Sequence, residues 1–164
     1  KNLYRNISPT KLPEILELLE GEDQQVKSHF FRLLTDLNDY KTLTIIFRDK
    51  DVAVGENVGY GLGDTRSEAK QAIPALIQVL KDENKWVREN DAVALGKIGP
   101  AAKQAIPDLI QLLDDEYNMV RRYAASALGD IGPEAKQSVP ALILALNDSD
   151  SDVRESAAWA LRGR

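Results

Sequence analysis

Few residues in this chain have side chains that could act as catalysts. The sequence has no cysteine and a single histidine, His29, among its 164 residues. The lack of cysteine excludes disulfides, thiolate nucleophiles and cysteine-bound zinc or iron–sulfur sites. One histidine also excludes a histidine-pair metal site and most catalytic triads. We therefore expect no catalytic residue, no metal site and no cofactor, and we interpret His29 as a structural residue.

Two segments look like ligand loops but do not fit the patterns that such loops need. Residues 55–63 contain four glycines, but they have neither G-x-G-x-x-G after a strand nor G-x-x-x-x-G-K-[ST]. The acidic run 148–152 begins like a calcium loop, yet Val153 stands where glycine is required and Trp159 where glutamate is required. We interpret the glycines as close-packing positions of a helix and the acidic run as a helix start.

Aspartate and arginine recur at a regular spacing that could form a charged binding strip. Asp82, Asp115 and Asp148 are 33 residues apart, and three arginines follow at the same interval. Aspartate is also a natural cap or turn residue before a helix. The regular spacing means that these residues belong to repeated units.

The repeat is visible without gaps. Ala72–Gln104 aligns with Ala105–Gln137, and 21 of the 33 aligned positions are identical. The pattern continues to the end of the chain and can be followed back, more weakly, to about residue 12. We therefore predict one domain over residues 1–164. Its five predicted units are approximately 12–39, 40–71, 72–104, 105–137 and 138–164.

Each unit is predicted to form two helices. In the first, Ile73, Leu76, Ile77 and Leu80 follow the spacing of one apolar helical stripe, with a proline in the first turn. The second carries small alanines on its apolar stripe, and a Gly-Pro pair ends it. No segment alternates like a strand. The predicted fold class is all-α, an α-solenoid in which each unit packs only against its neighbours.

The repeated motif is I-P-x-L-I-x-x-L-x-D followed by V-R-x-x-A-A-x-A-L-G-x-I-G. From Ala72 to Leu161 it resembles the HEAT-like repeats of the phycobilisome (PBS) lyase type. This resemblance implies a right-handed superhelix of about five two-helix repeats, with a concave surface lined by the second helices. It also implies that the recurring charges pair between units as a structural ladder. The predicted ladder residues are Asp82, Asp115, Asp148, Arg88, Arg121 and Arg154.

Composition and fold class together favour a non-enzymatic scaffold that binds another protein. Lysine plus arginine number 21 against 26 acidic residues, so the net charge of −5 speaks against nucleic acid. No apolar run is long enough to span a membrane, and we expect a cytoplasmic protein. The resemblance leaves two alternatives: a phycobiliprotein chromophore lyase subunit or related chaperone, with a bilin or phycobiliprotein as partner, and a nucleic-acid-binding protein such as the alkylpurine DNA glycosylases.

The binding face is predicted from the helical positions that vary between units. Counted at 100° per residue from the core valine of each second helix, positions i+2, i+3 and i+6 point away from the core. They include tyrosine and tryptophan, which anchor interfaces. For Trp159 the alternative is packing under a following unit. The predicted partner-binding residues of the concave face are Glu56, Asn57, Tyr60, Glu89, Asn90, Val93, Arg122, Tyr123, Ser126, Glu155, Ser156 and Trp159.

One position breaks the core pattern. Asp91 stands where the neighbouring units have Ala124 and Ala157, on the side of the helix that faces the core. A buried carboxylate without a partner is costly, so we expect a half-exposed Asp91 that pairs with an arginine or a backbone donor. The alternative is a functional polar site. Leu95 and Leu128 are predicted to be buried between units.

Overall fold

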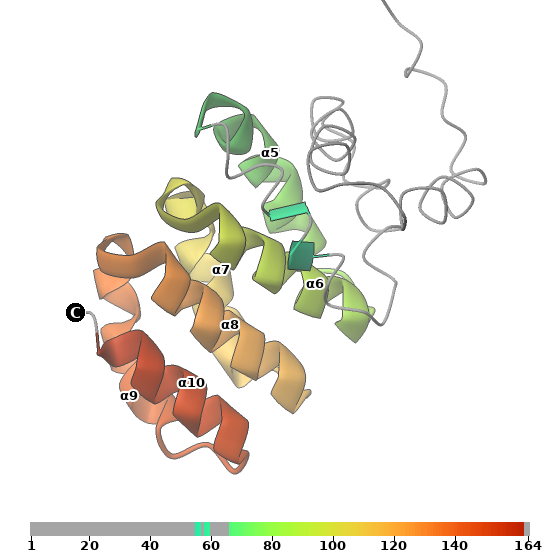
Figure 1. Cartoon of the computed structure of the whole chain (residues 1–164). Helices are drawn as coiled ribbons and strands as arrows, with labels where there is room; N and C mark the ends of the chain where they lie inside the picture. The colour runs from blue at the N-terminus through green and yellow to red at the C-terminus, as the bar shows by residue number, and fades with distance from the viewer. Residues whose placement is uncertain (1–54, 57, 60–65, 163–164) are drawn as a thin grey trace, which may run out of the picture.

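Helix pairs follow one another along the chain (Figure 1). The computed structural model describes residues 55–56, 58–59 and 66–162, and no strand occurs among them. In this part of the chain the elements are α5 (Arg66–Val79), α6 (Lys85–Ile98), η2 (Gly99–Ala105), α7 (Ile106–Gln111), η3 (Leu112–Asp114), α8 (Asn118–Ile131), η4 (Gly132–Ser138), α9 (Val139–Ala145) and α10 (Ser151–Leu161).

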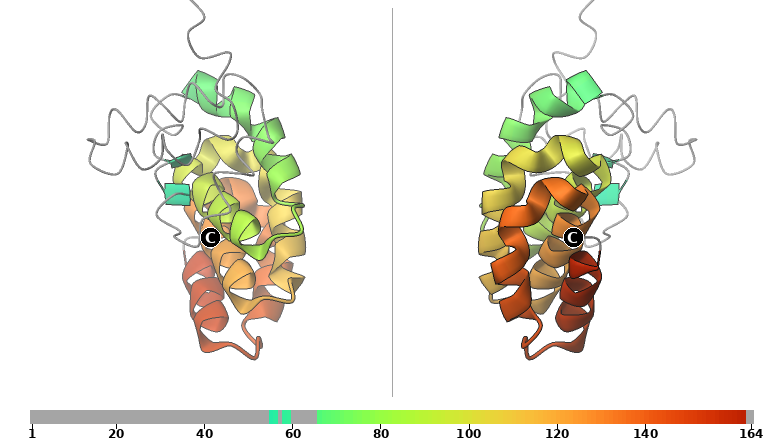
Figure 2. Two further views of the ribbon diagram at one scale, coloured as in Figure 1. Left: turned by 90° about the vertical axis from the view of Figure 1, so that its right-hand side faces the viewer. Right: turned by 90° about the vertical axis from the view of Figure 1, so that its left-hand side faces the viewer.

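The pairs stack in two layers. Helices α5, α7 and α9 form one layer and the second helices α6, α8 and α10 form the other (Figure 2). In the second layer α8 packs between α6 and α10. The predicted α-solenoid is therefore confirmed. His29 and most of the first two predicted units lie outside the described residues. Only residues 55–56, 58–59 and 66–71 of these two units are described.

Side-chain caps start α6 and α10, and glycines with positive φ end α6 and α8. The Asn84 side chain accepts a hydrogen bond from the backbone N–H of Trp86 at the start of α6. Gly99 and Gly132 end α6 and α8 with φ of 70° and 74°, a conformation that only glycine adopts without strain. The chain then continues as the short 3₁₀ helices η2 and η4, which begin with these Gly-Pro pairs.

The first helix of the unit 72–104 begins earlier than the sequence predicts. Helix α5 starts at Arg66, so Pro74 lies inside it rather than in its first turn. The reason is local: Arg66-Ser67 stand where the following units have Gly-Pro. Without that helix breaker the connecting residues join the first helix.

The core is continuous along the stack. Its fully buried large side chains come from both layers and include Leu76, Leu109, Leu95 and Leu128. The prediction that Leu95 and Leu128 are buried is confirmed, since both are 0% exposed. No helix in the described part of the chain has the length and apolar character that crossing a bilayer requires.

Candidate functional site

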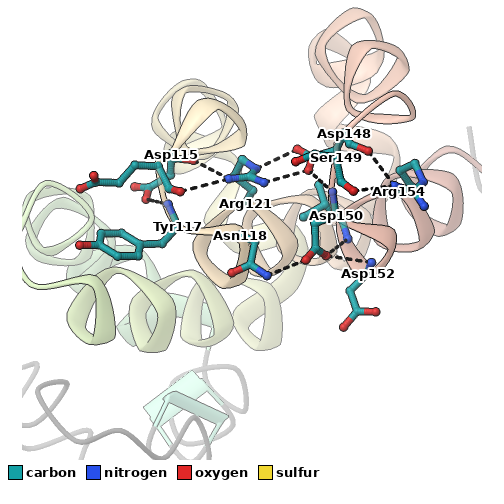
Figure 3. A network of polar contacts seen from close by, with 11 residues as sticks. Asp115, Tyr117, Asn118, Arg121, Asp148, Ser149, Asp150, Asp152 and Arg154 are labelled. Carbon is teal, nitrogen blue, oxygen red and sulfur yellow. Dashed lines mark hydrogen bonds and ion pairs between the residues drawn. The ribbon is translucent and has the colours of Figure 1, made fainter.

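A chain of charged contacts runs along the turns between first and second helices (Figure 3). Each turn aspartate accepts a hydrogen bond from the backbone N–H two residues ahead, as Asp115 does from Tyr117 at 3.0 Å. Asp82 and Asp148 make the same contact at 2.8 and 2.9 Å. This local bond fixes the carboxylate before any arginine reaches it.

Arginines of one unit pair with aspartates of the next. The Nε and Nη2 atoms of Arg88 donate to the Asp115 carboxylate at 2.8 and 3.0 Å. The same atoms of Arg121 donate to Asp148, both at 2.8 Å. The four side chains are only 8–14% exposed. Gly55 occupies the repeat position that Arg88 and Arg121 occupy in the later units, so this unit supplies no arginine for Asp82. Asp82 makes no ion pair with any described residue.

We expect Arg121→Met to lower the free energy of unfolding by about 1.5–3 kcal/mol at neutral pH, because it leaves the shielded Asp148 carboxylate unpaired. The hydrogen bond from Arg121 holds the pKa of Asp148 below its usual range. The stability it confers is present above the unfolded carboxyl pKa and lost as the pH falls through the folded one. The difference between the two proteins should therefore shrink below about pH 4.

Urea titrations at several pH values measure this effect. Arg122→Met is the matched control, because the Arg122–Asp152 pair is 3.4 Å long and its side chains are 39% and 55% exposed. We expect the control to cost about 1 kcal/mol or less. Equal losses from the two substitutions would contradict a structural ladder.

A hollow lies across the second helices. Its cavity has a volume of about 270 Å³. Residues from α6, α8 and α10 line it, together with Glu56 from the unit before them. The remaining lining residues are Ala92, Val93, Gly96, Lys97, Arg122, Tyr123, Ser126, Ala127, Asp130 and Trp159. We call this hollow the groove.

Many residues of the predicted binding face lie in or beside the groove. Those that line it are Glu56, Val93, Arg122, Tyr123, Ser126 and Trp159. Glu155 and Ser156 line a second hollow, which shares Arg122, Ser126 and Trp159 with the groove. Asn57 and Tyr60 lie outside the described residues.

The predicted exposure of three positions on α6 is wrong. Glu89, Asn90 and Val93 are 3%, 1% and 8% exposed, and only Val93 lines the groove. Asn90 is a structural residue: its Oδ1 accepts a hydrogen bond from the Gly55 N–H at 2.8 Å. A helix in the middle of a stack has neighbours on both flanks, so more than one apolar stripe is covered. Counting positions from a single apolar stripe predicts one buried side of the helix, and it does not reveal the side that the other neighbouring helix covers.

Trp159 packs backward, toward the preceding unit. A Cβ added at Gly129 would overlap the six-membered ring of Trp159, so the indole lies directly on this glycine of α8. The side chain is nevertheless 46% exposed. The ring therefore packs on the preceding unit and forms part of the groove wall. Packing under a following unit stays an alternative for its exposed part.

The groove carries charges of both signs. Burial raises the pKa of Asp130, and the nearby Lys97 partly offsets this effect. Arg122 lies 5.5 Å from the centre of the Tyr123 ring and pairs with Asp152. Sequence reasoning missed Lys97 and Asp130, which occupy position i+10 of their helices. The predicted face ended at position i+6, and including the position one helical turn further along would have found them.

Asp91 of α6 also differs from its predicted environment. It is 0% exposed, and among the described residues neither carboxylate oxygen has a hydrogen-bond partner. The expectation of a half-exposed, paired Asp91 is therefore wrong. Its position on the core face places it where the next two units have Ala124 and Ala157, both also 0% exposed. Burial raises its pKa well above the usual range.

The groove brings aromatic, cationic and carboxylate side chains together. Among the described residues no three histidine, cysteine, aspartate or glutamate side chains cluster as a metal site. What the second helices offer is an aromatic surface with cations and carboxylates around it. The stacked helix pairs place the chain in the class of helical-repeat proteins.

Comparison with known proteins gives the family. The family model for HEAT repeats matches residues 41–118 and 106–163, and the chain belongs to the HEAT repeat family. The finer assignment to the phycobilisome lyase type stays a prediction. A search of the curated proteins found no match.

Solved structures with similar folds include designed armadillo repeat proteins. An engineered protein has a TM-score of 0.51 and 21% identity, over 90% of this chain and 76% of that one. A designed armadillo repeat protein in complex with the peptide (KR)4 has a TM-score of 0.52 and 19% identity, over 92% and 80%. The CpcE–CpcF complex of phycocyanin lyase from Nostoc reaches only 0.42 at 23% identity, over 75% and 64%, and carries no argument about activity.

Proposed function

We propose that this chain is a non-enzymatic scaffold that binds a protein partner in the groove across α6, α8 and α10. The observation that carries the proposal is the groove itself, a cavity of about 270 Å³ lined by aromatic and charged side chains of consecutive units. A partner side chain that fills this volume leaves water, and the residues that dominate interface energies sit in such desolvated pockets.

The contrast between fixed and variable positions supports this proposal. The core leucines Leu95 and Leu128 are the same in both units, whereas the groove positions of these units differ in charge and size. A repeat protein can vary such positions without changing its fold, because each helix keeps its buried stripe. The complex of a designed armadillo protein with a peptide is consistent with a protein partner for this fold.

The test begins with peptides selected from a displayed library on the full chain. Arg122→Ala combined with Trp159→Ala should weaken the binding of a selected peptide at least tenfold. Both side chains are partly exposed in the groove, so the melting temperature should change little. Titration calorimetry gives the affinity and thermal melting followed by circular dichroism gives the stability.

The matched control is Gln78→Ala combined with Gln111→Ala on the first helices, where both glutamines are exposed. We expect this pair to leave the affinity unchanged. Equal losses from the groove pair and the glutamine pair would contradict the groove as the site. Loss from the glutamine pair alone would place the partner on the opposite layer.

A further inference from the structure

Asp130 places a carboxylate across the floor of the groove. Its backbone belongs to α8, but a Cβ added at Gly96 of α6 would lie only 3.0 Å from its Oδ2 atom. The side chain therefore reaches from one second helix to the next, and both residues line the groove. Helix α8 packs between α6 and α10, so this site has described neighbours on both flanks.

The Asp130 carboxylate has no fixed partner in the described part of the chain. No described residue forms an ion pair or a hydrogen bond with it. Burial raises the pKa of Asp130, and the opposing effect of Lys97 is smaller. The residue is nevertheless exposed, so a partner can reach it. The carboxylate has thus lost part of its hydration without gaining a compensating contact.

The cations around the groove have contacts of their own. Arg122 pairs with Asp152 at 3.4 Å, and its guanidinium carbon lies 5.5 Å from the centre of the Tyr123 ring. Lys97 also makes a further contact. Both cations have long flexible stems, so their charged ends can stay in water when a partner covers the groove. The short side chain of Asp130 does not have this freedom.

A side chain that fills the groove must cover Asp130, and its charge decides the cost. An apolar side chain would take the carboxylate out of water and give nothing in exchange. An acidic side chain would add repulsion to this loss. A lysine or arginine side chain would replace the lost hydration with a charge-assisted hydrogen bond.

The surroundings of Asp130 fit both parts of such a side chain. Gly96 and Ala127 lie next to the carboxylate and leave room for a methylene stem to pack. Trp159 forms the wall beside them, because its ring packs on Gly129, the residue before Asp130. An aromatic face attracts a cation that lies over it. A carboxylate and an aromatic ring therefore meet at one place in the groove.

We propose that the groove takes one lysine or arginine side chain of the partner protein, with Asp130 as its counter-ion and Trp159 as the aromatic wall. This inference rests on the proposed function, because it names the chemistry of the side chain that the groove binds. It assigns Asp130 the role of selecting the partner by charge. The other lining residues supply shape and contact area.

Two matched synthetic peptide libraries test the proposal on the full chain. The central residue is lysine or arginine in one library, and its uncharged analogue norleucine or citrulline in the other. The random flanking positions contain no lysine or arginine, so a single cation distinguishes the libraries. We expect groove binders from the cationic library. Replacing the central cation of a selected peptide with its uncharged analogue should weaken binding by about tenfold or more.

Asp130→Asn identifies the group that the cation meets. It removes the charge and keeps the size and polarity of the side chain. In this variant the change from the cation to its uncharged analogue should alter the affinity little, as expected when two charges interact directly. Asp114→Asn, an exposed position of η3 outside the groove, is the matched control and should leave the affinity unchanged. Thermal melting followed by circular dichroism shows that both variants fold.

The outcomes separate this proposal from the proposed function. Peptides whose binding is lost in Arg122→Ala with Trp159→Ala bind in the groove. If such peptides bind equally well with the uncharged analogue, or prefer the cation equally in Asp130→Asn, the role of Asp130 is overturned and the groove remains a protein-binding site. If neither library yields a peptide that depends on the groove pair, both proposals are overturned.

Discussion

Replacing Asp91 with alanine should raise the free energy of unfolding at pH 7 by about 2–3 kcal/mol. The carboxyl group is fully buried, and neither oxygen has a hydrogen-bond partner in the part of the chain that the structure describes. The folded state therefore loses the hydration of this group and gains nothing in exchange. Alanine fills the same place in the next two units and is the better helix former. Urea unfolding of both proteins measures the difference.

The gain from Asp91→Ala depends on pH, and the raised pKa of Asp91 fixes the sign. Above the unfolded value of about 3.9 the unfolded chain releases this proton, while the folded chain keeps it until the pH reaches the raised pKa. The original protein loses stability across this window. The gain should therefore be smallest below about pH 4, grow with rising pH, and become constant above the folded-state pKa.

Asp91→Asn separates the charge from the missing hydrogen bonds. It removes the titration but keeps a buried polar group, so its stability relative to Asp91→Ala should not change with pH. A loss of stability in Asp91→Ala would show that the carboxylate has a favourable partner. A pH-independent gain would contradict the raised pKa.

Leu128→Ala should lower the free energy of unfolding by about 2–5 kcal/mol. Leu128 is 0% exposed and belongs to the continuous core of the stacked units. Removing most of its side chain leaves a cavity that helix α8, held between α6 and α10, closes only in part. Thermal and urea unfolding followed by circular dichroism measure the loss.

Leu144→Ala is the matched control, since the same atoms are removed from a side chain that is 74% exposed. We expect a change of about 0.5 kcal/mol or less. An unchanged melting temperature in Leu128→Ala would contradict the repeat alignment that places this leucine in the core.

The sequence predicted the structure correctly in most places where one unit could be aligned with the next. The 33-residue alignment predicted two helices per unit, the solenoid fold and the burial of Leu95 and Leu128. It also located most of the groove, because many positions of the second helices that differ between units lie off the apolar stripe. Glu89, Asn90 and Asp91 are buried exceptions. Repetition supplies this contrast within a single chain.

Prediction failed where a unit differs from its neighbours or where a contact comes from the flank. The absence of Gly-Pro before Ala72 allowed α5 to begin at Arg66. Asn90 was placed on the exposed face, but it binds the backbone of Gly55. Such contacts depend on how far the preceding second helix reaches along α6, and helical periodicity alone contains no information about that distance.

The regular ladder also has a consequence for how the chain assembles in time. Each arginine–aspartate pair joins residues 27 positions apart, so every pair closes a loop of the same modest length. Contacts this local favour fast folding, and stacked repeats fold by nucleation in one unit followed by propagation to the next. Nucleation is expected among residues 105–161, which contain no fully buried carboxyl group like that of Asp91. Propagation toward α6 should then be the slow step, because it carries the Asp91 carboxyl group out of water.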